Sequence, residues 1–287
     1  MGQYAKLIDI SKCVGCRACE VACKEWNETG TDDPVYHPFG YQSHEDLTYS
    51  TWNVVKFFEQ HNTIDNSVET ALPSWSFRKH GCMHCSDAAC VQACPVDALA
   101  RNQQHGYVHL DVAVCTGCGY CVDACPFDVP KLAPGAVLGF GTVSKCRLCS
   151  DRIQHGMSPA CVQSCPPNAL EFGDRLEMIE LGHRRIEDLQ TRGYTDAYLY
   201  GEHELGGLNV LTVLPGKPEN FDLPANPVVP TYLKTWKEIV KPVGVLAIAG
   251  TALALGFGFI NSLWQNSKTE KGKVAHGTAS STATNQE

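Results

Sequence analysis

Cysteine spacing constrains this chain more than any other feature of its sequence. The 287 residues contain 16 cysteines, and every one falls into one of four tight groups. Their spacings are C-x2-C-x2-C-x3-C, C-x2-C-x4-C-x3-C, C-x2-C-x2-C-x3-C and C-x2-C-x11-C-x3-C. The groups are Cys13, Cys16, Cys19 and Cys23; Cys82, Cys85, Cys90 and Cys94; Cys115, Cys118, Cys121 and Cys125; and Cys146, Cys149, Cys161 and Cys165. Such repetition predicts one structural unit used four times, with loop insertions.

The grouping favours metal ligation over disulfide bonds. Disulfide frameworks are typical of small secreted chains, whereas this chain is long and most neighbouring cysteines of a group are separated by only two or three residues. The second, third and fourth groups each end in Cys-Pro, at Cys94, Cys125 and Cys165. In two-cluster ferredoxins, three cysteines of a run hold one cluster and the cysteine before proline holds the other. Two groups therefore predict two clusters, and four groups predict four.

Zinc is the main alternative metal, because it also uses Cys-x2-Cys pairs. Zinc needs two such pairs for each ion, which leaves the runs of three cysteines and the trailing Cys-Pro unexplained. A missing cysteine would indicate a three-iron cluster, but all 16 positions are filled. The sequence therefore predicts four [4Fe-4S] clusters and about 16 iron atoms per chain. Abundant zinc with little iron would instead indicate a structural zinc scaffold.

Histidines and basic residues flank the cysteine groups. Because the cysteine set is complete, His80 and His84 are expected beside a cluster or at the surface rather than as iron ligands. Positive charge near a cluster raises its reduction potential. The basic residues in such positions are Lys12, Arg17, Lys145 and Arg147. Ordinary solvated side chains are the alternative for all four.

The rest of the chain has its own organisation. Residues 24–81 form an insertion between the first two groups, with a predicted strand at 54–58, and are either a packed subdomain or a surface for a partner. Residues 175–192 have the pattern of an amphipathic helix and 208–214 that of a strand. Residues 215–230 contain five prolines and are predicted to be a linker.

Residues 242–264 contain no charged side chain and match the length that crosses a bilayer. Trp236 and Trp264 lie near the two ends, where aromatic belts occur. A buried helix of a soluble core is the alternative. Three lysines precede the span and three follow it, so the positive-inside rule gives no orientation. The polar tail at 266–287 is predicted to be disordered.

Charge and the N-terminal sequence exclude further classes. The net charge of -8 gives no reason to expect a nucleic-acid partner. The first residues show neither an apolar stretch nor a twin arginine, so export would depend on a signal carried by another chain.

These observations predict an α+β fold of two pseudo-symmetric double-cluster ferredoxin-like modules with insertions, followed by one C-terminal transmembrane helix. The expected divisions are a four-cluster domain at 1–174 with the insertion 24–81, an extension and linker at 175–230, an anchor at 231–265 and a tail at 266–287.

Several segments resemble the beta subunit of membrane-bound formate dehydrogenase. They are Lys-Leu-Ile-Asp at 6–9, Cys-Val-Gly-Cys-Arg-Ala-Cys at 13–19, Cys-Lys-Glu-Trp-Asn at 23–27, Gly-Cys-Met-His-Cys at 81–85, Gly-Cys-Gly-Tyr-Cys at 117–121, Cys-Pro-Phe at 125–127, Lys-Cys-Arg-Leu-Cys-Ser-Asp-Arg at 145–152, Pro-Ala-Cys at 159–161 and Arg-Gly-Tyr at 192–194. The resemblance covers nearly the whole chain. The cysteine groups alone are shared with the wider class of four-cluster subunits of molybdopterin oxidoreductases.

The resemblance implies a pairing that spacing alone leaves open, with the first group paired to the fourth and the second to the third. The implied ligand sets are set A (Cys13, Cys16, Cys19, Cys165), set B (Cys23, Cys146, Cys149, Cys161), set C (Cys82, Cys85, Cys90, Cys125) and set D (Cys94, Cys115, Cys118, Cys121).

The resemblance also implies a function and partners. The chain would relay electrons from a catalytic subunit with a molybdenum or tungsten pterin to a membrane cytochrome b and quinone, with its cluster domain in the periplasm. No segment resembles a pterin or substrate site, so no catalytic residue is predicted. The same role in a hydrogenase, polysulfide or sulfoxide reductase complex is the alternative.

Overall fold

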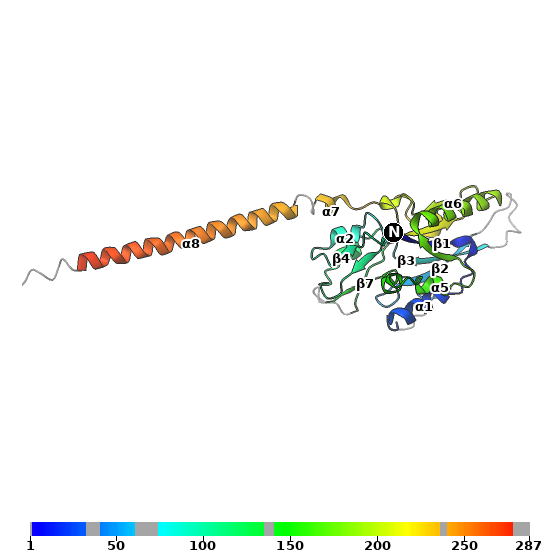
Figure 1. Ribbon diagram of the computed structural model, residues 1–287, viewed down its shortest axis with the longest axis horizontal. Helices are drawn as coiled ribbons and strands as arrows, with labels where there is room; N and C mark the ends of the chain where they lie inside the picture. Colours follow the sequence, from blue (N-terminus) through cyan, green and yellow to red (C-terminus); the bar gives the residue numbers. More distant parts are fainter. Residues whose placement is uncertain (1, 33–40, 61–73, 135–140, 236–239, 278–287) are drawn as a thin grey trace, which may run out of the picture. The chain divides into compact units, whose positions relative to one another are not determined.

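A computed structural model of the chain describes residues 2–32, 41–60, 74–134, 141–235 and 240–277. The chain divides into two units, Met1–Pro230 and Thr231–Glu287, and Figure 1 shows the elements of each. The first unit carries all 16 cysteines. The boundary falls where the proline-rich segment ends.

A four-stranded sheet joins the two ends of the first unit. Its strands are β1 (Tyr4–Asp9), β8 (Leu170–Asp174), β9 (Tyr198–Tyr200) and β10 (Val210–Leu214), in the order β8-β1-β10-β9. Strand β1 runs parallel to β10 and antiparallel to β8, so the N-terminal strand is central. The segment after the cysteine groups is therefore part of the same fold.

Helix α6 (Arg175–Thr191) lies alongside this sheet, as Figure 1 shows. Its buried residues include Met178 and Leu189, which form one apolar cluster with Leu7 and Leu211 of the sheet. The predicted amphipathic helix is confirmed, and the predicted strand at 208–214 is present from Val210 onward.

Three two-stranded hairpins complete the strands that the structure describes. They are β2 (Asn53–Gln60) with β3 (Ser74–Gly81), β4 (Leu99–Arg101) with β5 (Val108–Leu110), and β6 (Lys131–Leu132) with β7 (Val143–Ser144). Successive side chains of a strand point to opposite faces. Arg78 and His80 of β3 accordingly meet Asp222 and Asp46, while Lys79 between them faces the cysteine loops.

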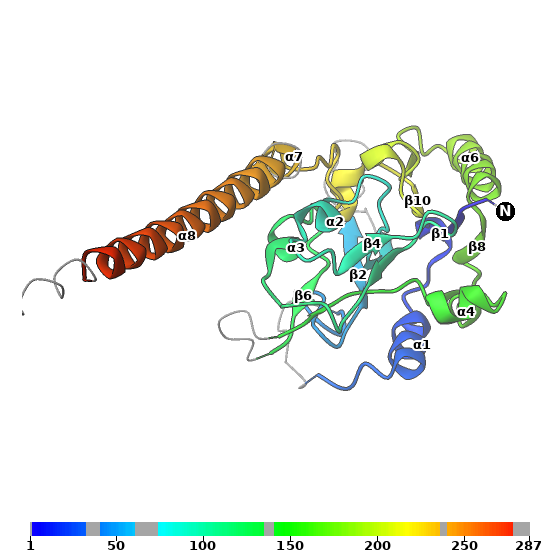
Figure 2. The same cartoon turned by 60° about the vertical axis from the view of Figure 1, so that its left-hand side comes forward.

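Short helices follow the ligand loops. They are α1 (Ala18–Asn27), α2 (Ala89–Ala93), α3 (Tyr120–Asp123), α4 (Ser150–Gln154) and α5 (Ala160–Gln163), and the short 3₁₀ helices of the unit are η1 (Ile10–Lys12), η2 (Glu204–Gly206) and η3 (Pro218–Phe221). Helix α1 contacts α5, and α2 contacts α3. Figure 1 shows the first pair on one side of the unit, and Figure 2 shows the second pair on the other side.

The proline-rich segment is packed rather than extended away from the unit. Phe221 is fully buried and its ring lies 5.7 Å from that of Phe58. The hydroxyl of Tyr200 donates to the carbonyl of Pro224 at 2.8 Å. This packing differs from the predicted linker, because Phe221, Leu223 and Val229 between the prolines are buried.

The second unit consists of α7 (Thr231–Thr235) and α8 (Lys241–Gly277). The segment Pro242–Trp264 of α8 has the length and a mean hydropathy of 2.2 that suit a membrane span. The helix continues to Gly277, which differs from the disordered tail predicted at 266–287. No proline interrupts 265–277, so the helix can continue beyond the apolar segment. Trp236 and residues 278–287 lie outside the described residues.

Candidate iron–sulfur sites

Two cavities in the first unit are each lined by four cysteines. They are named cavity A and cavity B. The cysteines that line them are Cys13, Cys16, Cys19 and Cys165 in cavity A, and Cys23, Cys146, Cys149 and Cys161 in cavity B. Each cavity therefore combines three cysteines from one end of the cysteine region with one from the other end. These are the members of sets A and B.

The second and third groups come together in the same way. Burial raises the pKa of Cys85, and the neighbouring sulfurs of Cys82, Cys90 and Cys125 raise it further. Burial likewise raises the pKa of Cys121 to about 12, with further contributions from Cys118, Cys115 and Cys94. The cysteines of sets C and D are therefore close enough to influence one another electrostatically.

All four Cys-x2-Cys loops share one backbone feature. The residue before the second cysteine has a positive φ in each loop: 67° at Gly15, 49° at His84, 66° at Gly117 and 55° at Leu148. In the fourth loop the N–H of Leu148 donates to Sγ of Cys146 at 3.4 Å, and the backbone N–H groups of Gly15 and His84 likewise reach the first cysteine of their loops. Hydrogen bonds to a ligand sulfur stabilise its thiolate and tune a bound cluster.

A second backbone feature separates the first group from the others. The third residue after each Cys-Pro cysteine has a positive φ: 53° at Asp97, 50° at Asp128 and 51° at Asn168. The first group has no such proline, and α1 continues through Cys23 to Asn27. The side chain of Asn27 donates to the carbonyl of Cys23 at 2.9 Å and to its Sγ at 3.6 Å.

The four sets are neighbours in the order A, B, C, D. Lys79 lines both cavity A and cavity B. Trp52 forms a buried cluster with Cys23 and Cys146 of set B, and Cys82 of set C packs against that cluster. Cysteines of sets C and D pack together around Leu99 and its neighbours; they are Cys85, Cys90, Cys94, Cys115 and Cys121. Contacts therefore run from one set to the next.

Buried lysines lie among these cysteines. Lys6, Lys79 and Lys145 are 2, 5 and 1 % exposed. The ammonium of Lys145 donates to the carbonyls of Val108 at 2.6 Å and Cys146 at 3.2 Å, so this residue is not a solvated side chain. A buried cation needs nearby negative charge. Burial by itself lowers the pKa of Lys79, but surrounding cysteine sulfurs outweigh this and raise it.

The other flanking basic residues make surface or aromatic contacts. The guanidinium of Arg17 lies 5.1 Å from the ring of Phe57, and that of Arg147 lies 5.3 Å from the ring of Trp52. Lys12 forms a 3.7 Å ion pair with Glu171. Sequence reasoning missed Lys6, which lies in the mainly apolar strand β1, and Lys79, which lies between Arg78 and His80 in β3.

Neither histidine lies at the surface, which corrects that part of the prediction. His84 is fully buried and its Nδ1 accepts the N–H of Val108 at 3.0 Å, while its Nε2 has no partner among the described residues. His80 forms a 3.5 Å contact with Asp46, and burial lowers its pKa to about 4.

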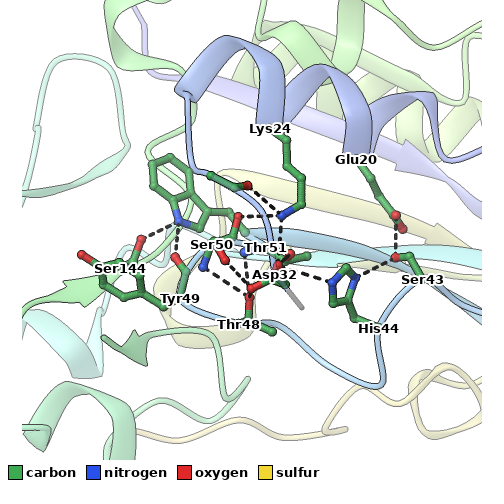
Figure 3. Close-up of polar contacts among 12 residues, drawn as sticks. Glu20, Lys24, Asp32, Ser43, His44, Thr48, Tyr49, Ser50, Thr51 and Ser144 are labelled. Atoms are coloured by element: carbon green, nitrogen blue, oxygen red, sulfur yellow. Dashed lines mark hydrogen bonds and ion pairs between the residues drawn. The ribbon is translucent and has the colours of Figure 1, made fainter. Parts of the chain in front are cut away.

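The described part of the insertion supports the cysteine region from one side. Figure 3 shows Asp32 at the centre of a polar cluster that includes Lys24, directly after Cys23. Lys24 donates to Asp32 at 3.0 Å and Thr48 donates to it at 2.7 Å; Ser50 and Thr51 donate as well. The cluster continues to Trp52, whose indole N–H donates to the carbonyl of Tyr49 and to Ser144. The insertion thus packs against set B.

The donor chemistry of cavities A and B fits [4Fe-4S] clusters. Each cavity offers four sulfurs, and burial raises the pKa of both Cys19 and Cys23 to about 12. A buried thiol gives up its proton when it binds a metal cation. Four thiolates are the complement of a cubane cluster.

Comparison with known proteins agrees with this chemistry. Two family models described as "4Fe-4S dicluster domain" match residues 12–98 and 73–175. The formate dehydrogenase-O iron-sulfur subunit of Escherichia coli (strain K12) is 40 % identical over 264 residues, which are 90 % of this chain and 83 % of that protein.

Two further relatives are similar to this chain over most of its length. The formate dehydrogenase iron-sulfur subunit of Haemophilus influenzae is 39 % identical over 255 residues, 88 % of this chain and 78 % of the relative. The hydrogenase-2 operon protein HybA of Escherichia coli O157:H7 is 34 % identical over 280 residues, covering 86 % of this chain and 82 % of that protein. By its cysteine-lined cavities and by this similarity over most of its length, the chain belongs to the formate dehydrogenase iron-sulfur subunits, a family of electron-transfer proteins.

Proposed function

We propose that this chain is the electron-transfer subunit of a formate dehydrogenase complex and holds four [4Fe-4S] clusters, one in each of sets A to D. The observation that carries the proposal is the pair of cavities, each lined by four cysteines from two distant groups. When bound, the clusters supply one-electron redox chemistry and pass electrons between a catalytic subunit and the membrane.

The protein contributes placement and electrostatics. Contacts between sets A and B, B and C, and C and D support an arrangement of the four sites in series. Buried lysines offset the negative charge of the thiolates, and backbone N–H groups such as that of Leu148 hydrogen-bond ligand sulfurs. The repeated φ pattern of the four loops supports a pseudo-symmetric arrangement of two double-cluster modules.

The partners follow from the family. We assign a molybdenum or tungsten pterin catalytic subunit as the electron donor and a membrane cytochrome b as the acceptor, so this chain performs no bond chemistry itself. The segment Pro242–Trp264 anchors the chain in the bilayer, and the cluster unit lies in the periplasm, exported with its catalytic partner.

Purification of the complex under anaerobic conditions tests the proposal. The expected result is about 16 iron atoms per chain, formate-dependent bleaching of the cluster absorbance, and a co-purifying pterin subunit. A colourless protein, or one that contains mainly zinc, would refute the cluster assignment.

A hydrogenase complex is the second candidate, because HybA is 34 % identical to the chain. Cluster reduction by hydrogen but not by formate, with a hydrogenase large subunit in the complex, would favour that candidate over formate dehydrogenase. The chain's own role would be the same in both complexes.

Single cysteine replacements test the ligand sets. Cys165→Ser is expected to alter the EPR signal of the cluster held by Cys13, Cys16 and Cys19. Cys161→Ser is the matched control, since Cys161 lies in α5 shortly before Cys165 but lines cavity B. If Cys165→Ser damages only the cluster of Cys146, Cys149 and Cys161, the proposed pairing is wrong.

A further inference from the structure

Lys79 occupies a special place between two candidate clusters. Among the residues that the structure describes, it alone lines both cavity A and cavity B. It stands on β3 opposite Val55 of β2, and strand alternation turns it toward the cysteines while Arg78 and His80 face the other way. A single side chain is therefore shared by two ligand sets.

The surroundings of Lys79 are built to hold an ammonium group inside the protein. Only 5 % of the residue is exposed. The sulfurs that act on its charge come from both sets, Cys19 from set A, and Cys23, Cys146 and Cys161 from set B. Nζ of Lys79 lies beside Gly81, where an added Cβ would stand 3.6 Å from it. The lysine is thus enclosed by the two sites.

We infer that Lys79 sets the reduction potentials of the clusters in sets A and B together, by placing one fixed positive charge between them. This inference rests on the proposed function, in which both cavities hold [4Fe-4S] clusters. Reduction adds one negative charge to a cluster, so a nearby cation stabilises the reduced form and raises the potential. Burial keeps solvent and salt from screening that charge.

The inference concerns only the clusters of sets A and B. The cysteine sulfurs that act most strongly on Lys79 belong to sets A and B, whereas Lys145 and Lys6 act on Cys82 and Lys145 acts on Cys90 of set C. Lys6 lines cavity B but not cavity A. Removing the charge of Lys79 should therefore shift two potentials and leave two unchanged, a pattern that general loosening of the fold would not produce.

EPR-monitored redox titration of the intact complex tests this. Lys79→Met and Lys79→Gln remove the charge with little loss of volume, and Lys79→Arg retains it. Lys56→Met is the matched control, because Lys56 lies on the neighbouring strand and pairs with Asp222 on the face away from the cavities. In both neutral variants the midpoint potentials of clusters A and B should become more negative, while those of C and D stay at the wild-type values. Lys79→Arg and Lys56→Met should leave all four potentials near wild type.

The possible outcomes distinguish a failure of the inference about Lys79 from a failure of the proposed function. If the wild-type complex lacks clusters in sets A and B, the proposed function fails. If those clusters are present and their potentials do not move in the neutral variants, or all four move equally, the inference about Lys79 fails. If the neutral variants lose the iron of clusters A and B, retention of that iron in Lys79→Arg supports a requirement for charge. Loss of the same iron in Lys79→Arg would overturn the inference, because the shape of the side chain rather than its charge would then determine whether the clusters are retained.

Discussion

Asp32→Asn is expected to destabilise the cysteine-rich unit by about 3 kcal/mol, because it neutralises the centre of the polar cluster beside Cys23 (Figure 3). The side chain of Asp32 is 16 % exposed, and its carboxylate accepts hydrogen bonds from Lys24, Thr48, Ser50 and Thr51. A hydrogen bond to a charged group contributes about 1.5–3 kcal/mol. The asparagine retains one acceptor oxygen, so the four losses do not add. For a unit of this size, about 3 kcal/mol corresponds to a fall in Tm of about 6–12 °C.

The same carboxylate gives the prediction a pH signature. Burial acts to raise the pKa of Asp32, but hydrogen bonds from the surrounding hydroxyls and Lys24 outweigh burial and hold the pKa below the usual 3.8. Its stabilisation is therefore complete above the unfolded pKa and is lost as pH falls through the folded pKa. Asparagine does not titrate, so the Tm gap between wild type and variant should be constant near neutral pH and shrink on acidification below 3.8.

Scanning calorimetry at one heating rate measures the Tm gap, and Asp188→Asn is the control. Asp188 is exposed and pairs only across one helical turn with Arg192 at 3.4 Å, so its replacement should change Tm little. An unchanged Tm for Asp32→Asn at neutral pH, or a gap that widens in acid, would refute the structural role given to this cluster.

Three further substitutions test other parts of the structure. Phe221→Ala should cost about 3–5 kcal/mol of stability by chemical denaturation, because the ring is fully buried; a neutral effect would restore the interpretation of residues 215–230 as a linker. Gly117→Ala should reduce the iron content from about 16 to about 12 atoms per chain, which is the loss of one cluster. The φ of Gly117 is 66°, and a Cβ there would lie 1.9 Å from the carbonyl oxygen of Gly141. An unchanged iron content would show that the loop adapts to the substitution. Leu253→Arg should cost about 2.5–3.5 kcal/mol in membrane insertion and increase release by alkaline carbonate, whereas Leu176→Arg on the exposed side of α6 should not.

Local patterns in the sequence predicted the elements that depend on local forces. The helix at 175–192 follows from apolar side chains at helical spacing, and the strand at 54–58 from a run of valine and phenylalanine. Residues 215–230 were predicted to be a linker, but a count of prolines carries no information about where Phe221 lies. Its burial depends on Phe58, which is far away in the chain.

In the candidate site, too, local spacing predicts some features, whereas others depend on residues that are distant in the sequence. Spacing identified every cysteine, because a ligand loop must bring its sulfurs together within a few residues. Spacing could not identify which distant cysteine completes each cavity, and only the resemblance to a known family implied the sets that line cavities A and B. The sequence also gives no sign of the positive φ at His84 and Leu148, because neither residue is glycine. The corresponding positions of the other two loops are Gly15 and Gly117, where a positive φ is expected.

Lys6 and Lys79 escaped sequence reasoning for a physical reason. A lysine in a strand normally indicates a solvent-exposed face, because burying an unpaired ammonium costs several kcal/mol, on the order of the stability of a whole domain. The cost falls only when negative charge lies nearby, and the cysteine sulfurs that provide it come from residues distant in sequence. Burial of these lysines is therefore linked to the thiolate state of the ligands. When clusters are bound, the negative thiolates stabilise the buried lysine ammonium groups. When the thiols are protonated, the same ammonium groups are buried with little negative charge nearby. Cluster binding and folding of the cysteine-rich unit should consequently be strongly coupled.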